Sequence, residues 1–401
     1  MKFEWTESTI EQICTLVTDG AHNSPKSVEN GEYMASVKDF TEYGFNFSEC
    51  RQISKEDYLK LKKQGCVPEK GDILVGKDGA RFFEDIIIYS QDEEPALLSS
   101  IAILRVDRNK VTPEFLYYTL KTPEVKKDVQ DNYGSGSAIP RIVLKDFKRM
   151  PVFYPSIDKQ KSITGICESI DNRIKLNTEI NRNLSEQAKA FFENIFRENA
   201  STKPATIADI ALNVTDGVHN TVKDNPNGQY LLLSCKNIKG GSLSIGSSER
   251  RIDSETFEKL RRRTKLEKGD ILISSVGTVG ELLLLNTEPS NYEFQRSVAI
   301  VKPNPELVSP AYVFESLVAQ RAELINAAHG AVQQCLFISD IAGFPIGVPN
   351  PSDLRHFDEV VTPMFDTISA NEAENSKLAI LRDALLPRLM SGEIDVSSIE
   401  L

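Results

Sequence analysis

The sequence predicts two tandem α/β (α+β) domains, each followed by one long helix. Three observations support this fold class. The chain has 401 residues, which is more than one hydrophobic core usually supports. A set of short motifs occurs twice in the same order, about 197 residues apart. A stretch with the apolar spacing of an amphipathic helix follows each set.

The duplication is clearest in two pairs of motifs. Val17–Ser24 and Val214–Thr221 agree at six of eight positions. Lys70–Leu74 recurs without change as Lys268–Leu272, and a turn that contains glycine follows in both copies. Matches that keep their order and spacing indicate a duplicated domain, because solenoid repeats have periods of only about 20 to 50 residues.

Each copy mixes predicted strands with predicted helices. Short apolar runs bounded by Gly, Pro or Asn predict strands at Asp85–Tyr89, Ser100–Val106 and Gln229–Ser234. Helices are expected at Thr112–Thr119 and Ser309–Asn326, because each begins with Ser or Thr before Pro, which is typical of an N-cap and a first helical residue. We therefore expect a mixed α/β domain in each half.

The long helices are predicted from a change of pattern. Beyond residue 157, and again beyond residue 352, apolar residues form a stripe spaced by three and four positions. A helix of about 40 residues is roughly 60 Å long. The alternative, in which each helix packs only on its own domain, is less favoured because such a domain is too small to cover that length. We predict that the two helices pair as an antiparallel coiled coil and hold the domains at opposite ends of a rod.

Asparagines on both stripes support this pairing. Asn177 lies on the first stripe, and Asn371 and Asn375 lie on the second. A buried asparagine in a coiled coil costs stability but fixes register and partner choice. The predicted seam residues are Ile163, Ile170, Asn177, Leu184 and Phe191 on the first helix and Val361, Ile368, Asn371, Leu378 and Leu385 on the second.

These patterns divide the chain into globular domains and helices. The two globular domains are expected to have nearly equal length. The predicted segments are domain 1 at 1–156, a central spacer helix at 157–199, domain 2 at 200–351, a C-terminal spacer helix at 352–392 and a tail at 393–401.

Composition excludes several classes of protein. A net charge of −11 argues against general binding to polyanions, so nucleic-acid binding would need local basic surfaces or a partner that supplies positive charge. Six cysteines without a C-x-x-C pair and only four histidines predict reduced cysteines and no metal site. The chain shows no membrane-length apolar run and no signal-like start, so we expect a cytoplasmic protein.

Familiar catalytic motifs do not occur in the sequence. It contains neither the G-x-x-x-x-G-K-[ST] phosphate loop, nor a full dinucleotide fingerprint, nor a G-x-S-x-G elbow, and we predict no catalytic residues. The Asp-Gly-x-His motifs that begin at Asp19 and Asp216 allow three interpretations. They form a catalytic pair, a structural turn in which glycine has positive φ and histidine bonds to backbone, or a contact with DNA.

Taken together, these motifs resemble the specificity subunits of type I restriction-modification systems. The resemblance covers essentially the whole chain and rests on the Thr-Asp-Gly-x-His-x-[Ser/Thr] motifs at Thr18 and Thr215, the two Lys-Gly-Asp-Ile-Leu runs, the Gly-rich loop at 134–141 and the two long helices. The second copy departs from the first in that loop, where Gly330–Gln334 stands in place of Gly136–Pro140.

The resemblance implies two target-recognition domains, each reading one half of a split DNA sequence, with the helices setting the gap between the halves. It implies that the helices dock modification (methyltransferase) subunits, which associate with restriction subunits that translocate and cut DNA. The chain itself would be non-catalytic. S-adenosylmethionine, ATP and magnesium would be used by the partner subunits. The alternative is a scaffold or decoy protein that binds modification subunits without reading DNA.

Candidate DNA contacts follow from the chemistry of base recognition. Arg and Lys favour guanine, Asn and Gln favour adenine, and phosphate contacts supply affinity. The basic run at Arg261–Lys265 fits either a phosphate-facing surface or a solvated helix face. The predicted DNA-binding residues are Thr18, Asp19, His22, Lys77, Arg81, Ser137 and Arg141 in the first half and Thr215, Asp216, His219, Arg261, Arg262, Arg263, Ser275, Thr278, Arg296, Gln333 and Gln334 in the second.

Overall fold

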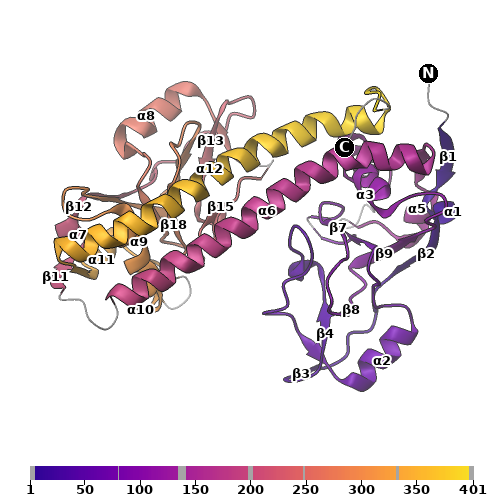
Figure 1. The fold of residues 1–401 in the computed structure, drawn as a ribbon, viewed down its shortest axis with the longest axis horizontal. Helices are drawn as coiled ribbons and strands as arrows, with labels where there is room; N and C mark the ends of the chain where they lie inside the picture. Colours follow the sequence, from indigo (N-terminus) through magenta and orange to yellow (C-terminus); the bar gives the residue numbers. More distant parts are fainter. Residues whose placement is uncertain are drawn as a thin grey trace. The chain divides into compact units, whose positions relative to one another are not determined.

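The computed structural model divides into two compact units. The first unit comprises residues 1–173 and 377–401, and the second comprises residues 174–376. Two helices contribute to both units: α6 spans Ile157–Phe196 and α12 spans Pro351–Met390 (Figure 1). The structure describes residues 5–79, 81–133, 141–196, 202–246, 249–330 and 334–396.

The first unit is built on β-sheets. Its strands are β1 (Thr6–Thr9), β2 (Cys14–Asp19), β3 (Ser27–Val28), β4 (Glu32–Ala35), β5 (Gln52–Ile53), β6 (Ile73–Gly76), β7 (Ile86–Ile88), β8 (Ala96–Leu97), β9 (Ile101–Val106) and β10 (Pro151–Tyr154). Four of them form an antiparallel sheet in the order β2-β9-β6-β7. A second sheet has the order β3-β5-β4-β8, and β1 pairs with β10.

Short helices connect and cover these strands. They are α1 (Ile10–Ile13), α2 (Lys55–Lys63), α3 (Pro113–Lys121), α4 (Pro123–Asn132) and α5 (Leu144–Arg149), with a 3-10 turn η1 at Val37–Asp39. Helix α3 begins as predicted, because the Thr112 hydroxyl accepts a hydrogen bond from the Phe115 amide at 3.1 Å and proline follows the cap.

The second unit repeats the plan in the same order along the chain. Its strands are β11 (Lys203–Thr206), β12 (Ala211–Asp216), β13 (Tyr230–Leu233), β14 (Ile238–Lys239), β15 (Ser242–Leu243), β16 (Arg251–Ile252), β17 (Ile271–Ser274), β18 (Leu282–Leu284), β19 (Tyr292–Phe294), β20 (Val298–Pro303) and β21 (Pro345–Val348). Its central sheet has the order β12-β20-β17-β18, which matches β2-β9-β6-β7. Its other pairings are β16-β13-β19, β11-β21 and β14-β15.

The helices of the second unit correspond to those of the first, with one difference from the prediction. They are η2 (Cys235–Asn237), α7 (Ile207–Ile210), α8 (Ser254–Thr264), α9 (Pro310–Ala319), α10 (Arg321–Asn326) and α11 (Ile338–Ala342). The single helix predicted over Ser309–Asn326 is wrong, because Gln320 leaves helical geometry. Next to the break, the Arg321 Nε atom donates to the Gly280 carbonyl at 2.6 Å, and this bond ties the chain to the turn after β17.

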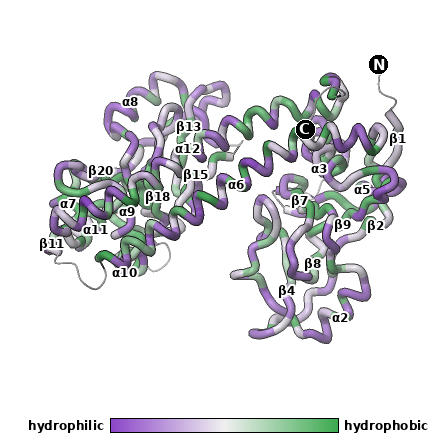
Figure 2. The backbone as a smooth tube through the Cα atoms, viewed as in Figure 1, coloured by the Kyte–Doolittle hydropathy of each residue, from purple (hydrophilic) through white to green (hydrophobic). Residues whose placement is uncertain are grey.

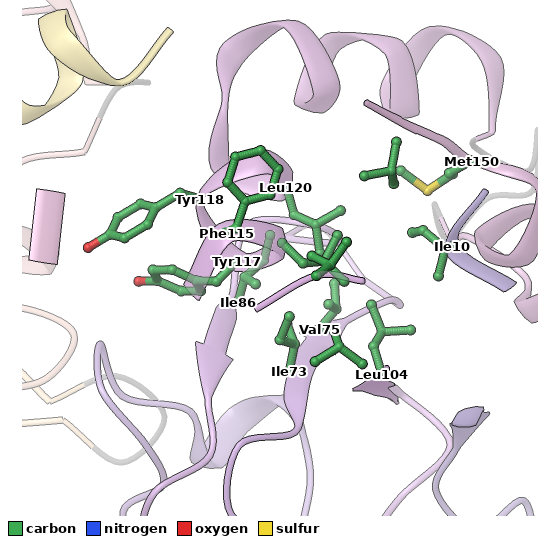
Figure 3. Close-up of a cluster of buried hydrophobic side chains, with 14 of the residues drawn as sticks. Ile10, Ile73, Val75, Ile86, Leu104, Phe115, Tyr117, Tyr118, Leu120 and Met150 are labelled. Carbon is green, nitrogen blue, oxygen red and sulfur yellow. The ribbon is translucent and has the colours of Figure 1, made fainter. Parts of the chain in front are cut away.

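Strand β6 shows why its motif is apolar without alternation. Ile73 and Val75 belong to the core cluster that contains Phe115, whereas Leu74 faces the opposite cluster that contains Tyr89. Figure 3 shows the first of these clusters, with Ile73 and Val75 among the side chains that pack between the sheet and α3. A strand that is buried on both faces has a continuous apolar run. Strand β17 divides its side chains between two clusters in the same way.

Within the second unit, α6 and α12 pair through asparagines. The Asn177 Nδ2 atom donates to Asn375 Oδ1 at 2.9 Å and to Glu374 Oε2 at 2.7 Å, and Asn371 Nδ2 donates to Asn181 Oδ1 at 2.8 Å. Since positions rise along one helix as they fall along the other, this pairing is antiparallel. Hydrophobic segments recur at intervals along both helices (Figure 2).

The helix segments of the first unit also pair in the antiparallel sense. The Arg382 Nη1 atom lies 2.7 Å from Asp171 Oδ1, and Ile163 packs in one cluster with Leu386 and Leu389. These contacts confirm the predicted fold class of two mixed domains with antiparallel paired helices. Of the predicted seam residues, Ile163, Ile170, Asn177, Val361 and Ile368 are buried, and Leu184, Phe191, Asn371, Leu378 and Leu385 are half-buried.

None of the helices within the described ranges is long and apolar enough to cross a membrane.

Candidate nucleic-acid interface

The strands β2 and β12 each end in a turn, and the two turns are equivalent. Asp19 and Asp216 are the last residues of these strands, and Gly20 and Gly217 follow. Neither glycine has positive φ, so that part of the structural interpretation is wrong. A Cβ on Gly20 would lie 2.2 Å from the Leu97 carbonyl oxygen, and the equivalent contact at Gly217 would be 2.1 Å. Glycine is therefore required here because two backbone segments approach closely.

Each turn holds a histidine against the preceding aspartate. The His22 Nε2 atom lies 3.2 Å from Asp19 Oδ1, and His219 Nε2 lies 2.6 Å from Asp216 Oδ2. The histidine side chains are 74% and 60% exposed, whereas the aspartates are 8% and 13% exposed. Each histidine therefore bonds to a carboxylate and not, as the structural-turn interpretation had it, to the backbone. Each imidazole is exposed, and the aspartate that holds it is buried.

A lysine or arginine also lies beside each aspartate, and it comes from a different element in each domain. In the first domain, Lys77 directly follows β6, and its Nζ atom lies 3.2 Å from Asp19 Oδ2 with a side chain only 8% exposed. In the second domain Ser275 occupies this place. Arg263, from the last turn of α8, supplies the charge instead, with Nη1 3.7 Å from Asp216 Oδ1.

Another arginine secures the far end of each turn. Arg51 donates from Nη2 to the Pro25 carbonyl and from Nη1 to Ser24 Oγ at 2.6 Å. Arg250 donates to the Val222 carbonyl at 2.7 Å. The sequence prediction missed Arg51 because it is far from Pro25 in the chain. Its only available signal was that Arg51 and Arg250 precede matching strands in the two copies.

We call the Gly-rich loop at 134–141 and its counterpart at 330–335 the late loops. The end of the first late loop meets the turn after β6. Asp78 forms a β-bridge with Arg141, and the Ile142 amide donates to the Lys77 carbonyl at 3.0 Å. Arg141 is exposed. Arg81 is 76% exposed in its side chain and pairs with Asp85 at 2.6 Å. Thr18 is half-buried within β2, and the predicted contact Ser137 lies outside the described residues.

The second domain gathers the equivalent segments. The Ser275 hydroxyl donates to the Arg296 carbonyl at 3.3 Å, and the Arg296 amide donates to the Val218 carbonyl at 3.0 Å. Cys335 forms a β-bridge with Val276, which brings the late loop beside the turn after β17. The exposed residues of this group are Arg296, Thr278 and Gln334, whereas Thr215 is half-buried within β12 and Gln333 lies outside the described residues.

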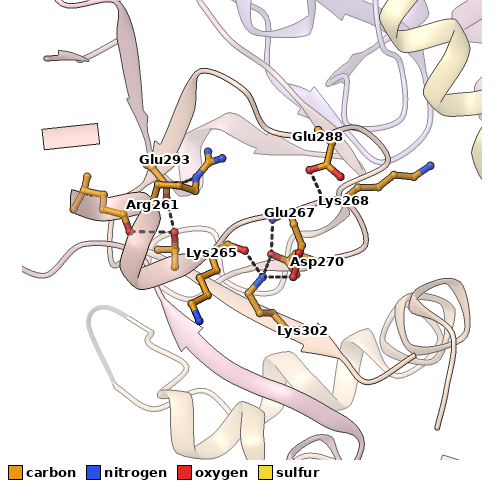
Figure 4. Close-up of polar contacts among 10 residues, drawn as sticks. Arg261, Lys265, Glu267, Lys268, Asp270, Glu288, Glu293 and Lys302 are labelled. Carbon is orange, nitrogen blue, oxygen red and sulfur yellow. Dashed lines mark hydrogen bonds and ion pairs between the residues drawn. The ribbon is translucent and has the colours of Figure 1, made fainter. Parts of the chain in front are cut away.

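The basic run at the end of α8 is largely engaged inside the domain. Arg261 pairs with Glu293, whose side chain is fully buried (Figure 4). Arg261 also donates to the Tyr292 carbonyl at 2.9 Å. Arg263 donates to the Asp216 carbonyl at 2.6 Å. Among the described residues, Arg262 is the arginine of this run that is exposed and has no such contact, whereas Arg261 and Arg263 are paired. A buried carboxylate needs a paired cation, and this explains why Arg261 turns inward.

The Lys-Gly-Asp-Ile-Leu motif has a structural role in both domains. Lys302 Nζ lies 2.6 Å from Asp270 Oδ2 and 3.2 Å from Glu267 Oε1, as Figure 4 shows. Burial raises the pKa of the Asp270 carboxyl to about 6, although the Lys302 ammonium opposes that shift. In the first domain Arg105 binds Asp72 at 2.8 Å in the same way. The motif therefore indicates the fold and not a DNA contact.

Within the described ranges, no group of three or more His, Cys, Asp and Glu side chains is placed to hold a metal ion.

The fold defines a class of proteins with two copies of one mixed domain, each copy bearing an exposed histidine turn and followed by a long helix. Residues 3–186 match the family described as the type I restriction modification DNA specificity domain. Residues 3–186 belong to that family, and the chain is similar over most of its length to specificity subunits of type I restriction enzymes. These matches confirm the resemblance inferred from the motifs.

The similar curated proteins are specificity subunits of type I restriction enzymes. The chain is 25% identical over 323 residues to the type I restriction enzyme MjaIX specificity subunit of Methanocaldococcus jannaschii, covering 73% of this chain and 72% of that protein. It is 22% identical over 403 residues to the HindI specificity subunit of Haemophilus influenzae, covering 81% and 87%. The crystal structure of a type I restriction-modification S subunit from M. genitalium aligns with a TM-score of 0.53 at 15% identity, covering 97% of this chain and 96% of that chain. This last likeness shows the fold alone.

Proposed function

We propose that this chain is a non-catalytic subunit that reads a two-part DNA target, one half with each recognition domain. The observation that carries the proposal is a shared frame with different exposed side chains. The turn after β6 presents Arg81 in one domain, the turn after β17 presents Thr278 in the other, and the late loops present Arg141 and Gln334. Because Arg favours guanine and Gln favours adenine, such surfaces suit two different half-targets.

The geometry also sorts the predicted contacts by accessibility. Buried groups such as Lys77 hold other residues in place, whereas exposed groups are free to meet DNA. The exposed candidates are His22, Arg81 and Arg141 in the first domain and His219, Arg262, Thr278, Arg296 and Gln334 in the second. Arg263 is also exposed, but it is held by Asp216. We propose that base specificity resides in the exposed Arg, Thr and Gln side chains of this set and in the late loops.

The long helices are proposed to dock modification subunits, and through them restriction subunits. Large apolar side chains remain exposed on both helices, with Leu176 on α6 at 48% and Ile380 and Leu381 on α12 at 71% and 48%. Exposed apolar side chains on a helix favour contact with another protein. The partners would bring the chemistry of S-adenosylmethionine, ATP and magnesium. They would also supply positive charge that binds the DNA phosphates, which suits a chain with a net charge of −11.

Methylation mapping tests the proposal. The chain is co-expressed with a cognate modification subunit, and methylated adenines are mapped across a genome. One split motif per complex is expected. Replacing residues 201–350 with the equivalent domain of a relative should change one half of that motif only, because each domain reads independently. A complex that assembles but methylates no specific sequence would support the scaffold or decoy alternative instead.

A further inference from the structure

Two loops of the molecule have the same internal bonds although they belong to different domains. We call residues 19–25 and 216–222 the histidine loops. Each begins with a buried aspartate that pairs with an exposed histidine, and each ends with a backbone carbonyl that accepts from an arginine, Arg51 or Arg250. Glycine at the second position lets each loop approach a neighbouring strand closely. Both ends of each histidine loop are therefore fixed.

The solvent side of each histidine loop is polar. His22, Asn23 and Ser24 are exposed in the first loop, and the matching residues 219–221, which are His, Asn and Thr, are exposed in the second. These side chains are hydrogen-bonding groups, and none of them is apolar. Such a surface fits the oxygens of a phosphate better than an apolar protein face.

The neighbours of the loops differ, whereas the loops share Asp, Gly, His and Asn at matching positions. Ser99 lies beside the first loop, where its amide donates to the Ala21 carbonyl at 3.0 Å, and the exposed Arg296 holds the same place beside the second. A surface that is the same in both domains does not distinguish two different half-targets. It suits the sugar-phosphate backbone, which is common to both halves.

We propose that the histidine loops are phosphate clamps, one for each half of the DNA target, and that base recognition is left to the variable neighbours. This inference rests on the proposed function, and it assigns to His22 and His219 the same sequence-independent contact. Lys77 and Arg263 are positioning residues, since each acts on the histidine through the aspartate between them.

The test uses the reconstituted complex with its modification subunit and two DNA duplexes, one with the mapped target and one without it. His22→Ala and His219→Ala are each expected to weaken binding to both duplexes by about three- to tenfold, with the methylated motif unchanged. Lys60→Ala, which removes an exposed cation from α2, is the matched control and should leave both affinities within about twofold.

A double-mutant comparison tests the positioning residues. Lys77→Met combined with Asp19→Asn removes the buried pair without leaving a lone charge. If the complex remains folded, this variant should weaken DNA binding as much as His22→Ala does, and adding His22→Ala to it should have little further effect. Full additivity of the two losses would contradict positioning through Asp19.

The remaining outcomes separate this inference from the proposed function. A changed motif in one half of the target would show base reading by the loop and overturn the clamp. Normal DNA affinity with poor assembly would show a protein contact instead and also overturn it. If the wild-type complex methylated DNA without a split motif, the proposed function would be overturned. The clamp would still be tested by the affinities of the histidine variants for the duplex that lacks the target.

Discussion

The two domains neutralise an equivalent buried aspartate with cations from different elements. Both bury an aspartate behind an exposed histidine, yet the first domain balances it with Lys77 from the turn after β6 and the second with Arg263 from the end of α8. The geometry of the histidine is similar in both. The comparison shows that both domains place a cation beside this aspartate, although the cation comes from a different element in each domain.

A second difference concerns the ion pair that the last turn of α2 makes in the first domain and the last turn of α8 makes in the second. Arg261 pairs with Glu293, whose side chain is 0% exposed, whereas Lys62 pairs with Glu94, and those side chains are 47% and 58% exposed. A buried carboxylate depends on its partner far more than an exposed one does. Loss of the cation of this pair should therefore lower the stability of the second domain more than that of the first.

The largest expected effect tests this difference directly. Arg261→Met should lower the free energy of unfolding of the second domain by about 3–5 kcal/mol, because Glu293 stays buried without its cation. Lys62→Met should cost the first domain less than about 1 kcal/mol. Urea unfolding followed by hydrogen exchange resolves the two domains. Arg261→Met/Glu293→Gln should recover most of the loss, and equal costs in both domains would contradict the comparison.

A glycine substitution tests the feature that the domains share. Gly20→Ala and Gly217→Ala should each destabilise their own domain by about 2–3 kcal/mol, since the new Cβ collides with a backbone carbonyl that cannot move away. Gly246→Ala is the control, because its nearest contact would be 3.6 Å away, at the Glu249 side chain. Thermal unfolding measures the effect. A loss in only one domain would mean that the two turns are not equivalent.

Substitution in the late loops should separate the two halves of the target. Arg141→Ala is expected to relax specificity in one half of the methylated motif by about 1–3 kcal/mol, and Gln334→Ala is expected to do so in the other half. Methylation of a library with randomised half-targets measures the preference at each position. If either change altered both halves, independent reading by the two domains would be wrong.

The smallest expected effect depends on pH and concerns matching positions in α3 and α9. The Tyr118 hydroxyl donates to Asp171 Oδ2 at 2.7 Å in the first unit. Glu315 stands at the matching place and is buried, and its Oε2 atom has no hydrogen-bond partner in the described part of the chain. Burial raises the pKa of Glu315 to about 8.

The sign of this effect follows from proton linkage. The pKa of the folded state lies above the unfolded value, so the contribution is fully present below about pH 4.5 and is lost as the pH rises through about 8. Within that window each pH unit lowers the free energy of unfolding by up to about 1.4 kcal/mol. Glu315→Gln should show a smaller fall between pH 6 and pH 7 than the wild type in matched urea titrations. Parallel curves would show that Glu315 does not titrate there.

Features with a local cause could be predicted from the sequence. The helix caps at Thr112 and Ser309 and the apolar strand that begins at Ile73 depend on neighbouring residues alone. The asparagines on the helix stripes could be assigned because the spacing of three and four residues places them on one face. Asn181, which accepts from Asn371, follows Asn177 by four residues and so lies on the same face, although the prediction did not include it.

Features with a distant cause could not be predicted. The basic run at Arg261–Lys265 suggests an exposed surface, yet Arg261 turns toward the buried Glu293, which is 32 residues away. The glycines of the two turns were expected to supply positive φ, whereas they make room for a neighbouring strand. In both cases the deciding partner belongs to another element, and its position depends on how the sheets pack.

The sequence by itself determined the duplication, the order of strands and helices and the family, because repeated motifs and apolar periodicity are properties of short segments. Only the tertiary structure decided which cation stands behind each exposed histidine. Lys77 is 58 residues from Asp19, and Arg263 is 47 residues from Asp216. Ion pairs over such separations form only after the strands have packed, because packing brings the charges together and removes the water that would otherwise screen them.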